Sequence, residues 1–331
     1  MAALTGIDLA VAPGEIFGLL GPNGAGKTTT LRILTTLLPA DAGEARVAGA
    51  DVRRDPALVR RRIGYVGQLG GADLNATGRE NLLLAGRLYG LSAGDANRRC
   101  AELLGVFGLA ELADRAVRTY SGGQRRRLEV ALGVMHRPRV LFLDEPSTGL
   151  DPQNRANLWD QIRELRDGGT TVFITTHYLD EADQLSDRVA IVDHGRVIAL
   201  GSPEALKRQY SGDTITITPD IGAPGAVGDA PEAPGDAVAT LAGELSGSDD
   251  VRRAVVENGA IRLTVTDPPR AMAAVLGVLA ASALPIQDVS VGRPSLDDVF
   301  LRETGRSLRD TGEDPASAAT AEAADAAEVA A

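Results

Sequence analysis

Short runs of consecutive apolar residues alternate along the chain with segments whose apolar residues recur every three or four positions. Runs of four to six apolar residues between turn-forming residues are typical of strands buried on both faces of a sheet. A repeat near 3.6 residues predicts helices. The pattern predicts strands at 16–20, 44–47, 63–66, 140–144 and 171–175, and helices near 31–38, 56–62 and 154–167. The front of the chain is therefore expected to be an α/β fold.

Three further patterns complete this front part. Residues 3–11 alternate apolar and polar side chains before the turn at 13–15, which predicts a hairpin that precedes the strand at 16–20. A second hairpin is expected to pair 189–192 with 197–200. Between about 75 and 127 the pattern is helical throughout, which predicts an inserted helical subdomain with helices at 80–89, 95–107 and 108–116 and a long helix at 125–135.

The pattern changes again after Arg208. Strands are expected at 214–218, 260–265 and 286–291, with helices at 270–281 and 296–303, and together they predict a small α+β domain over 211–306. The stretch 219–250 is rich in Gly, Pro, Ala and acidic residues and is expected to form loops. Residues 307–331 form an Ala-rich acidic tail that we expect to be disordered, since almost no large apolar group is available to bury.

Composition narrows the possible function and location. Residues 1–208 hold 26 basic and 25 acidic side chains, whereas the remainder holds 8 and 20, and this charge balance argues against bulk nucleic-acid binding, which needs a basic face. The arginine runs 60–62 and 125–127 are interpreted as solvated helix faces. A single cysteine, Cys100, fits a reducing compartment. The longest apolar segment, 271–284, is too short for a spanning helix, which needs about 20 residues, and a cytoplasmic location is expected.

A glycine-rich loop follows the strand at 16–20 and leads into a helix. Its form is Gly-x-x-x-x-Gly-Lys-Thr, the pattern of a phosphate-binding loop, although a plain glycine-rich turn is the alternative. The glycines let backbone N–H groups point inward, and Lys27 would reach the β- and γ-phosphates while the Thr28 hydroxyl ligates Mg²⁺. The expected nucleotide-binding residues are Gly21, Pro22, Asn23, Gly24, Ala25, Gly26, Lys27, Thr28 and Thr29.

Two carboxylates end the apolar strand at 140–144. Asp144 is expected to hold Mg²⁺, directly or through water, because doubly wound sheets place ligands at the carboxyl ends of their strands. Glu145 is the candidate general base for the attacking water, with an ordinary salt bridge as the alternative. His177 follows the strand at 171–175, a position where an isolated histidine is usually structural.

The phosphate loop, Gln68, the Ser-Gly-Gly-Gln of 121–124, and the Asp144–Glu145 pair followed by His177 occur in an order that resembles the ATP-binding cassette (ABC) ATPases of transporters. The resemblance covers residues 1–208. It implies a P-loop NTPase fold, a RecA-like core with an inserted helical subdomain and an antiparallel β subdomain, followed here by the α+β domain. It also implies ATP and Mg²⁺ as cofactors and a separate integral-membrane permease as partner, with no nucleic acid.

The same resemblance assigns roles to the remaining motif residues. Gln68 would contact the metal or the water and report nucleotide state to the permease, and His177 would bond the γ-phosphate. In a homodimer, the signature of one chain would cap the ATP of the other, with Leu150 and Asp151 in the loop that crosses the seam. The signature residues are Ser121, Gly122, Gly123 and Gln124.

Details of sequence narrow the resemblance to daunorubicin-resistance-type exporter ATPases. These details are Tyr120 before the signature, the sequence Gly-Tyr-Val-Gly-Gln at 64–68, and the segment 293–301 followed by Thr304 and Gly305. This implies efflux of a drug or lipid-like molecule by a complex whose ATPase lies on the cytoplasmic face of the cell membrane. The alternatives are a soluble cassette that acts on ribosomes or DNA repair and a P-loop kinase, which has no use for the Ser-Gly-Gly-Gln element.

One expected feature is absent from the sequence. Cassettes of this type place an aromatic residue ahead of the phosphate loop to stack on adenine, yet the first aromatic here is Phe17, which should face the core. Our expectation is that the native product starts about 15–20 residues before Met1 and carries this aromatic there. The alternative is that another side chain holds adenine, or that binding depends on the phosphates.

Overall fold

The computed structural model describes residues 3–210, 213–220, 234–248, 250–257, 259–282, 284–292 and 295–308. The chain divides into two compact units, which are described separately below. The first combines Met1–Pro203 with the segment that begins at Glu303, and the second is Glu204–Arg302. No described helix has both the length and the apolarity needed to cross a lipid bilayer.

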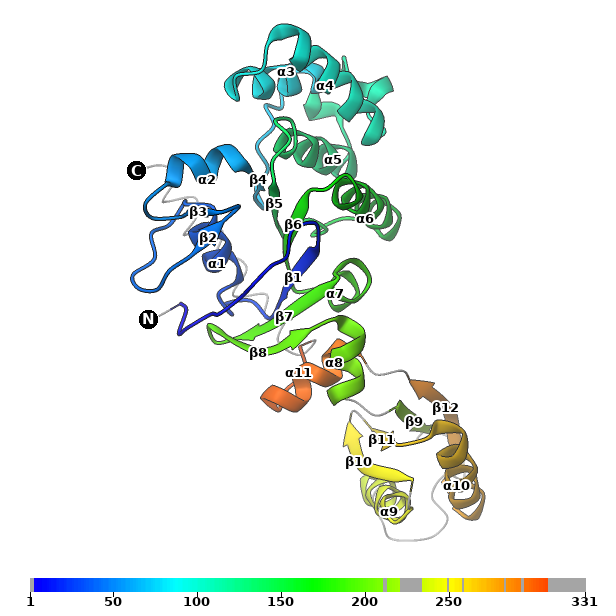
Figure 1. Ribbon diagram of the computed structural model, residues 1–331. Helices are drawn as coiled ribbons and strands as arrows, with labels where there is room; N and C mark the ends of the chain where they lie inside the picture. Colours follow the sequence, from blue (N-terminus) through cyan, green and yellow to red (C-terminus); the bar gives the residue numbers. More distant parts are fainter. Residues whose placement is uncertain are drawn as a thin grey trace. The chain divides into compact units, whose positions relative to one another are not determined.

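A six-stranded sheet forms the centre of the first unit, in the order β4-β5-β6-β1-β7-β8 (Figure 1). Neighbouring strands are parallel except for the hairpin of β7 and β8. Because β1 lies between β6 and β7, Gly18 is opposite both Ile174 and Val189. The strands are β1 (Ile16–Leu20), β4 (Ile63–Val66), β5 (Val140–Asp144), β6 (Thr171–Thr176), β7 (Arg188–Asp193) and β8 (Arg196–Gly201). The expected strands of the core are therefore confirmed.

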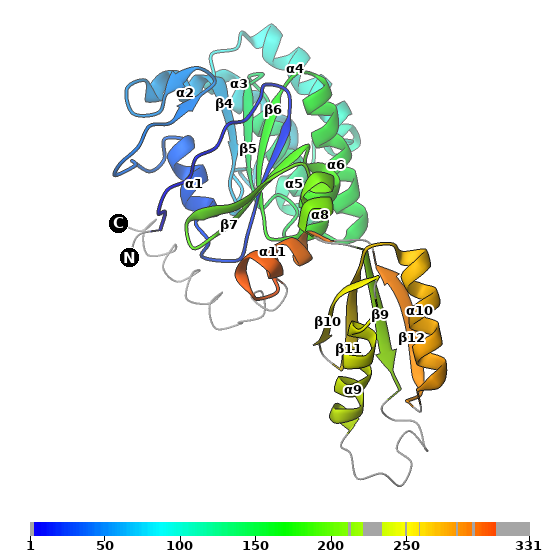
Figure 2. The ribbon, with the colours of Figure 1, turned by 60° about the horizontal axis from the view of Figure 1, so that its bottom comes forward.

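Helices cover both faces of this sheet (Figure 2). Alternate side chains of β1 enter different cores, since Phe17 packs with residues of α1 and α2 and Ile16 with residues of α5 and α6. This two-sided burial explains why the middle of each central strand is apolar. The helices are α1 (Lys27–Leu34), α2 (Pro56–Arg62), α5 (Gly122–Gly133), α6 (Pro152–Asp167) and α7 (Leu179–Leu185).

The segment 75–127 is helical, as expected, and contains α3 (Gly78–Leu88) and α4 (Ala93–Val106). The capping box of Thr77 and Glu80 begins α3, and the Ser92 side chain caps α4. The helix expected at 108–116 is wrong, because the chain forms only short 3₁₀ turns at Ala110–Leu112 and Val117–Thr119.

The hairpin expected from residues 3–11 is also wrong. This segment makes one isolated bridge, between Gly6 and Arg196, and its apolar residues pack on the core without pairing with each other. The strand expected at 44–47 is shortened to β2 (Arg46–Val47), which pairs with β3 (Ala50–Asp51). Helix α1 ends at Leu34, so Leu37 and Leu38 lie outside it and are exposed.

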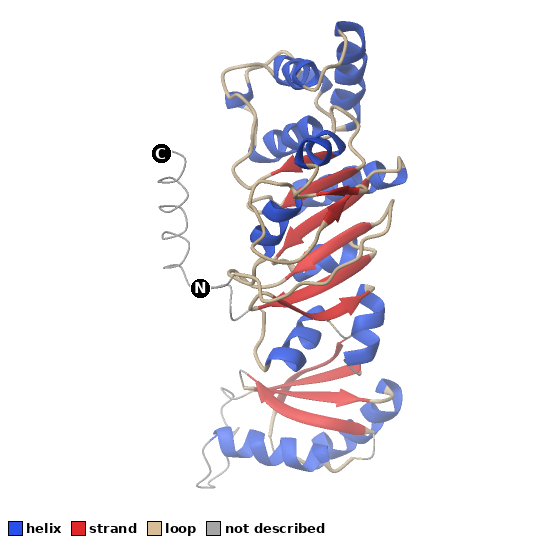
Figure 3. Ribbon diagram, turned by 60° about the vertical axis from the view of Figure 1, so that its left-hand side comes forward, coloured by secondary structure: helices blue, strands red, loops and turns tan. Residues whose placement is uncertain are grey.

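A four-stranded antiparallel sheet, ordered β10-β11-β9-β12, forms the second unit with helices α9 and α10 (Figure 3). Helices α8 (Pro203–Tyr210) and α11 (Leu296–Thr304) carry the chain out of the first unit and back. The remaining elements are β9 (Asp213–Pro219), α9 (Pro234–Ser246), β10 (Val251–Glu257), β11 (Ala260–Val265), α10 (Pro268–Ala281) and β12 (Ile286–Gly292).

Two expectations for this unit need correction. The loops expected over 219–250 are wrong for α9, which buries Val238, Leu241 and Leu245, and the sequence pattern did not predict β10. Residues 221–233, Arg293, Pro294 and 309–331 lie outside the described residues, so the expected loops and disordered tail there stay predictions.

The segment that returns to the first unit ends on the β7–β8 turn. Arg306 donates to both carboxylate oxygens of Asp193, at 2.8 and 3.0 Å. In the same turn, the N–H of Gly195 donates to the carbonyl of Ala25 at 3.1 Å. The last described residues are thus connected to the loop that follows β1.

Candidate nucleotide site

The glycine-rich loop joins the carboxyl end of β1 to the start of α1. Gly26 has a φ of 98°, and a Cβ there would lie 2.5 Å from Leu4 Cδ2 and 2.9 Å from the carbonyl of Ala3, so only glycine fits. No side chain caps α1, and its first turn contains no acidic residue. The first N–H groups of the helix are therefore available to an anion, which is what phosphates require.

Lys27 is buried at the start of α1, with 5% of its surface exposed. Its ammonium donates to the carbonyls of Gly21 at 2.8 Å and Pro22 at 3.0 Å, and it lies 3.5 Å from Oε1 of Glu145. Burial lowers the pKa of Lys27, and the charges of Glu145 and Asp144 oppose that shift. Asn23 and Gly24, at the tip of the loop, are exposed.

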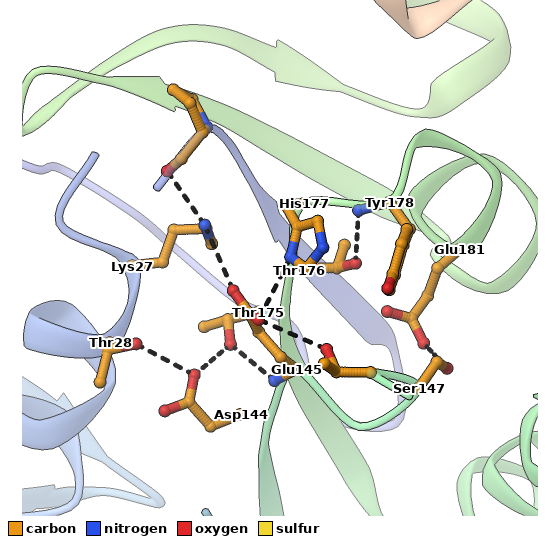
Figure 4. A network of polar contacts seen from close by, with 12 residues as sticks. Lys27, Thr28, Asp144, Glu145, Ser147, Thr175, Thr176, His177, Tyr178 and Glu181 are labelled. Carbon is orange, nitrogen blue, oxygen red and sulfur yellow. Dashed lines mark hydrogen bonds and ion pairs between the residues drawn. The ribbon is translucent and has the colours of Figure 1, made fainter. Parts of the chain in front are cut away.

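Asp144 ends β5 beside the phosphate loop (Figure 4). Its Oδ1 accepts hydrogen bonds from the hydroxyls of Thr28, at 3.3 Å, and Thr175, at 2.5 Å. Burial raises the pKa of this carboxyl, against the effect of the Thr175 bond. Among the described residues no three His, Cys, Asp or Glu side chains form a metal cluster. The oxygens of Thr28 and Asp144 nevertheless fit Mg²⁺ that is bound together with phosphates.

Glu145 lies between two basic side chains. Its Oε1 faces Lys27, and its Oε2 is 3.1 Å from Nδ1 of His177, which follows β6 (Figure 4). Burial alone would raise the pKa of Glu145, but the approach of His177 and the charge of Lys27 outweigh it, so the pKa lies below its ordinary value. The carboxylate is therefore ionised at neutral pH.

The backbone at Glu145 is turned sharply. Its φ of 44° is left-handed, a conformation that costs a non-glycine residue about 1–3 kcal/mol. The N–H of Glu145 donates to the carbonyl and the hydroxyl of Thr175, both at 3.1 Å, and these bonds hold the turn. This turn lets Asp144 face Thr28 while Glu145 faces Lys27 and His177.

Gln68 lies two residues after β4 and is exposed. It lines a cavity of about 510 Å³ together with Asp144. The structure therefore places Gln68 and Asp144 at the same cavity, although the two follow different strands.

Ser121 and Gln124 bond each other at the start of α5. Gln124 N–H donates to Ser121 Oγ at 3.3 Å, and Ser121 N–H donates to Gln124 Oε1 at 2.9 Å. A Cβ on Gly123 would lie 2.5 Å from Asn154 Cγ, and Asn154 bonds Asp151, the cap of α6. Among the described residues, no hydrogen bond joins the segment 121–124 to the phosphate loop.

Sequence reasoning missed four buried polar residues near these groups. The Ser147 hydroxyl donates to Glu181, and Trp159 Nε1 donates to both Ser147 Oγ and Glu181 Oε1 at 3.1 Å. Arg126 is buried, so interpreting 125–127 as a solvated face was wrong for this residue. The available signal was its spacing, because Gly123, Arg126 and Val130 share one helix face and all are buried.

Comparison with known proteins follows the same division of the chain. The family model "ABC transporter" matches residues 4–148, and the model "ATP-binding protein DrrA1-3-like, C-terminal domain" matches residues 201–304. The daunorubicin/doxorubicin resistance ATP-binding protein DrrA of Streptomyces peucetius is 46% identical over 93% of this chain and 89% of its own length. The linearmycin resistance ATP-binding protein LnrL of Bacillus subtilis is 35% identical over 92% of this chain and 94% of its own.

Solved structures agree with these relatives. An ATP-binding subunit of an ABC transporter superposes with a TM-score of 0.57 at 29% identity, covering 63% of this chain and 87% of its own. A dimeric ATP-binding cassette in a post-hydrolysis state bound to ADP and Pi gives 0.56 at 25% identity, covering 60% and 90%. These similarities favour transport over the ribosome and DNA-repair alternative. The fold, the site and the relatives together show that the chain belongs to the ATP-binding, ATP-hydrolysing subunits of ABC transporters and carries the C-terminal domain of the DrrA type.

Proposed function

We propose that this protein powers the export of a drug, an antibiotic or a lipid-like molecule. The observation that carries the proposal is the convergence of Lys27, His177 and Glu145 beside Asp144, which supplies the groups that ATP hydrolysis needs. The cargo class is supported by relatives named for resistance to daunorubicin, doxorubicin and linearmycin and for Nod factor export.

In this proposal, residues 21–29 bind the phosphates of ATP. The uncapped start of α1 supplies N–H donors, and Lys27 turns from the carbonyls of Gly21 and Pro22 to the β- and γ-phosphates. Thr28, Gln68 and Asp144 would hold Mg²⁺, which when bound neutralises charge on the β- and γ-phosphate oxygens. The hydrogen bond from the Thr28 hydroxyl to Oδ1 of Asp144 keeps two of these ligands side by side, which supports this set.

Glu145 acts as the general base. It orients a water and accepts its proton as the water attacks the γ-phosphorus. His177 holds Oε2 of Glu145 and would bond the γ-phosphate, while Lys27 keeps the carboxylate ionised by its charge.

We further propose that two chains form a head-to-tail homodimer. Ser121 and Gly122 are exposed at the start of α5, and Asp151 is exposed at the start of α6, so all three are accessible to a second chain. Ser121, Gly122, Gly123 and Gln124 would cap the γ-phosphate of the ATP that the partner chain binds. The dimeric form of a structurally similar cassette supports this arrangement.

The cavity beside Gln68 is the proposed contact with a separate integral-membrane permease. Its lining includes Leu69, Leu84, Leu88 and Tyr89, whose exposed fractions are 84%, 58%, 78% and 48%. Exposed apolar side chains around a cavity mark an interaction site for another protein. This contact would place the chain on the cytoplasmic face of the membrane, with 1–208 as the ATP-binding domain and 211–306 as an accessory domain.

Accumulation of daunorubicin in the native host tests the proposal. Deleting the gene should increase accumulation, wild-type protein should reverse the increase, and Glu145→Gln protein should not. Leu88→Arg should also fail to restore efflux while keeping the ATPase rate of the purified chain, because it changes only the permease contact. The proposal is contradicted if the Glu145→Gln protein restores efflux, or if both variants behave like the wild-type protein.

A further inference from the structure

One guanidinium in the first unit bonds three backbone carbonyls. Arg126 of α5 is 7% exposed, and each of its nitrogens donates to a carbonyl oxygen. Nε donates to Pro146 at 2.9 Å, Nη1 to Gly67 at 2.7 Å and Nη2 to Asp144 at 3.0 Å. Nη1 also donates to Oε2 of Glu129, at 3.1 Å.

These carbonyls belong to segments that are far apart in the sequence but adjacent at the site. Asp144 and Pro146 flank Glu145, so Arg126 fixes the chain on both sides of the base. Gly67 precedes Gln68, whose side chain lines the cavity. The planar fork of an arginine bonds several acceptors in one geometry, so moving one carbonyl moves the guanidinium relative to the others.

We propose that Arg126 is a positioning residue that couples the loop 67–71 to the catalytic carboxylates. When a permease contact displaces Gly67, Arg126 transmits the displacement to the carbonyls beside Glu145 and changes the position of the base. The proposal deepens the proposed function, on which its permease step rests. The link between the loop and the base exists within the isolated chain.

Glu129 supports this role from the cavity side. It lines the same cavity as Gln68 and pairs with Arg126, and the exposed Arg125 lies 3.8 Å from its Oε1. A Cβ on Gly70 would lie 2.1 Å from Oε1 of Glu129, so the loop passes directly over the pair. One continuous set of contacts thus links the loop 67–71, the Arg126–Glu129 ion pair and the turn at 144–146.

A simple structural role is the alternative, and Arg99 is the matched control. Arg99 is also largely buried, pairs with Glu102 at 2.6 Å and donates to the carbonyl of Val134 at 3.0 Å, at the end of the same helix α5. It reaches neither the loop 67–71 nor the catalytic turn. Lysine at either position keeps the charge but loses the fork of donors.

The test compares Arg126→Lys with Arg99→Lys in the purified full chain. We expect Arg126→Lys to lower kcat for ATP hydrolysis by roughly 10–100-fold, because a displacement of about 1 Å at a reacting group has this order of effect. KM should change by less than about threefold, since Arg126 contacts no phosphate-loop residue in the described chain. Amide hydrogen exchange of peptides over 67–73 should be about tenfold faster.

Arg99→Lys should leave kcat and the exchange over 67–73 within about twofold of wild type. The proposal is overturned if Arg126→Lys keeps the wild-type kcat, if KM rises as strongly as kcat falls, or if exchange over 67–73 is unchanged. Should Arg126→Lys not fold, Glu129→Ala takes its place, with a fall of about 3–10-fold in kcat expected and an unchanged kcat contradicting the proposal. If Glu145→Gln loses activity while Arg126→Lys keeps the wild-type kcat and the wild-type exchange over 67–73, the proposed function stands and only this inference is removed.

Discussion

The interiors of the two units differ in the polar groups they contain. The first unit buries Lys27, Arg126, Glu129, Asp144 and Glu181 close to the carboxyl ends of its strands. In the described part of the second unit, the buried polar side chains are Thr214 and Asp297, and the other buried side chains are apolar. Burying polar or charged groups costs free energy unless each finds partners. Even with partners, burial lowers the pKa of Lys27 and raises that of Asp144, so the first unit loses some stability in holding charged groups at its site, whereas the second unit buries mainly apolar side chains.

This contrast makes opposite predictions for substitutions in the two units. A change at a buried polar group of the first unit should alter activity more than stability. A change in the core of the second unit should do the reverse.

Glu145→Gln should slow ATP hydrolysis by roughly 10²–10⁴-fold, the usual contribution of a general base. ATP binding should be unchanged, because glutamine keeps the size of the side chain and the charge of Lys27 remains. Steady-state phosphate release and equilibrium binding of a fluorescent ATP analogue measure the two quantities. Hydrolysis at the wild-type rate would show that Glu145 is an ordinary partner of Lys27 and His177.

Lys27→Ala and Ser121→Arg should each abolish hydrolysis, yet a mixture should recover activity. In a head-to-tail dimer, one of the two sites then combines an intact phosphate loop with an intact signature from the other chain. Mixing the variants at equal concentration and measuring phosphate release tests this. Heterodimers that form but stay inactive would rule out shared sites.

Leu263→Ala should destabilise the second unit by about 2–5 kcal/mol, the usual cost of truncating a buried leucine. Leu263 is fully buried in β11, so calorimetry should show that unit unfolding at lower temperature. The ATPase rate should stay within about twofold, since this residue lies outside the first unit. A large fall in kcat would instead show that the second unit contributes to hydrolysis, which would contradict the contrast between the two units.

Asp144→Asn should stabilise the nucleotide-free protein while abolishing hydrolysis. Burial raises the pKa of Asp144 in the folded chain, so the unfolded state releases this proton at lower pH and the folded state loses stability as pH rises. Asparagine removes that loss, and its Oδ1 still accepts the bonds from Thr28 and Thr175. At pH 7 the Tm of Asp144→Asn should therefore lie above that of the wild-type protein.

A pH series provides the control for this stability effect. The difference in Tm should shrink as the pH falls to about 4, where an unfolded Asp is half protonated. A lower Tm for Asp144→Asn at pH 7 would mean that the ionised carboxylate stabilises the fold.

ATP and GTP should bind the 331-residue chain with dissociation constants within about fivefold of each other. Phe17 is fully buried, as its place in the strand predicted, and residues 3–15 contain no aromatic side chain. A stacked base contributes about 1–3 kcal/mol, so its absence leaves affinity dependent on the phosphates. Isothermal titration of both nucleotides measures this, and a strong preference for ATP would indicate another adenine contact.

The sequence predicted the sheet of the first unit because each central strand is buried on both faces. Strand 16–20 is an apolar run from end to end, and strand 140–144 consists of four apolar residues followed by Asp144. The pattern failed where burial is one-sided, as in α9 and β10, whose apolar residues are interspersed with glycine, alanine and charged side chains.

The site was predictable to the extent that it consists of contiguous motifs. Lys27, Asp144, Glu145 and His177 were expected as ligands or catalysts, and the structure brings their side chains together. Arg126 was not predicted, because its three carbonyl partners are backbone groups at positions 67, 144 and 146. Backbone acceptors carry no signal in the sequence, and only the fold identifies them.

The return of the chain to the first unit after Arg302 has a consequence for biosynthesis. A ribosome makes the chain from its N-terminus, so the phosphate loop is synthesised about 280 residues before Arg306, the partner of Asp193. The Arg306–Asp193 ion pair can therefore form only after the whole C-terminal domain has been synthesised. Premature termination within that domain would thus yield a cassette whose β7–β8 turn lacks this contact, although every nucleotide-binding motif had already been translated.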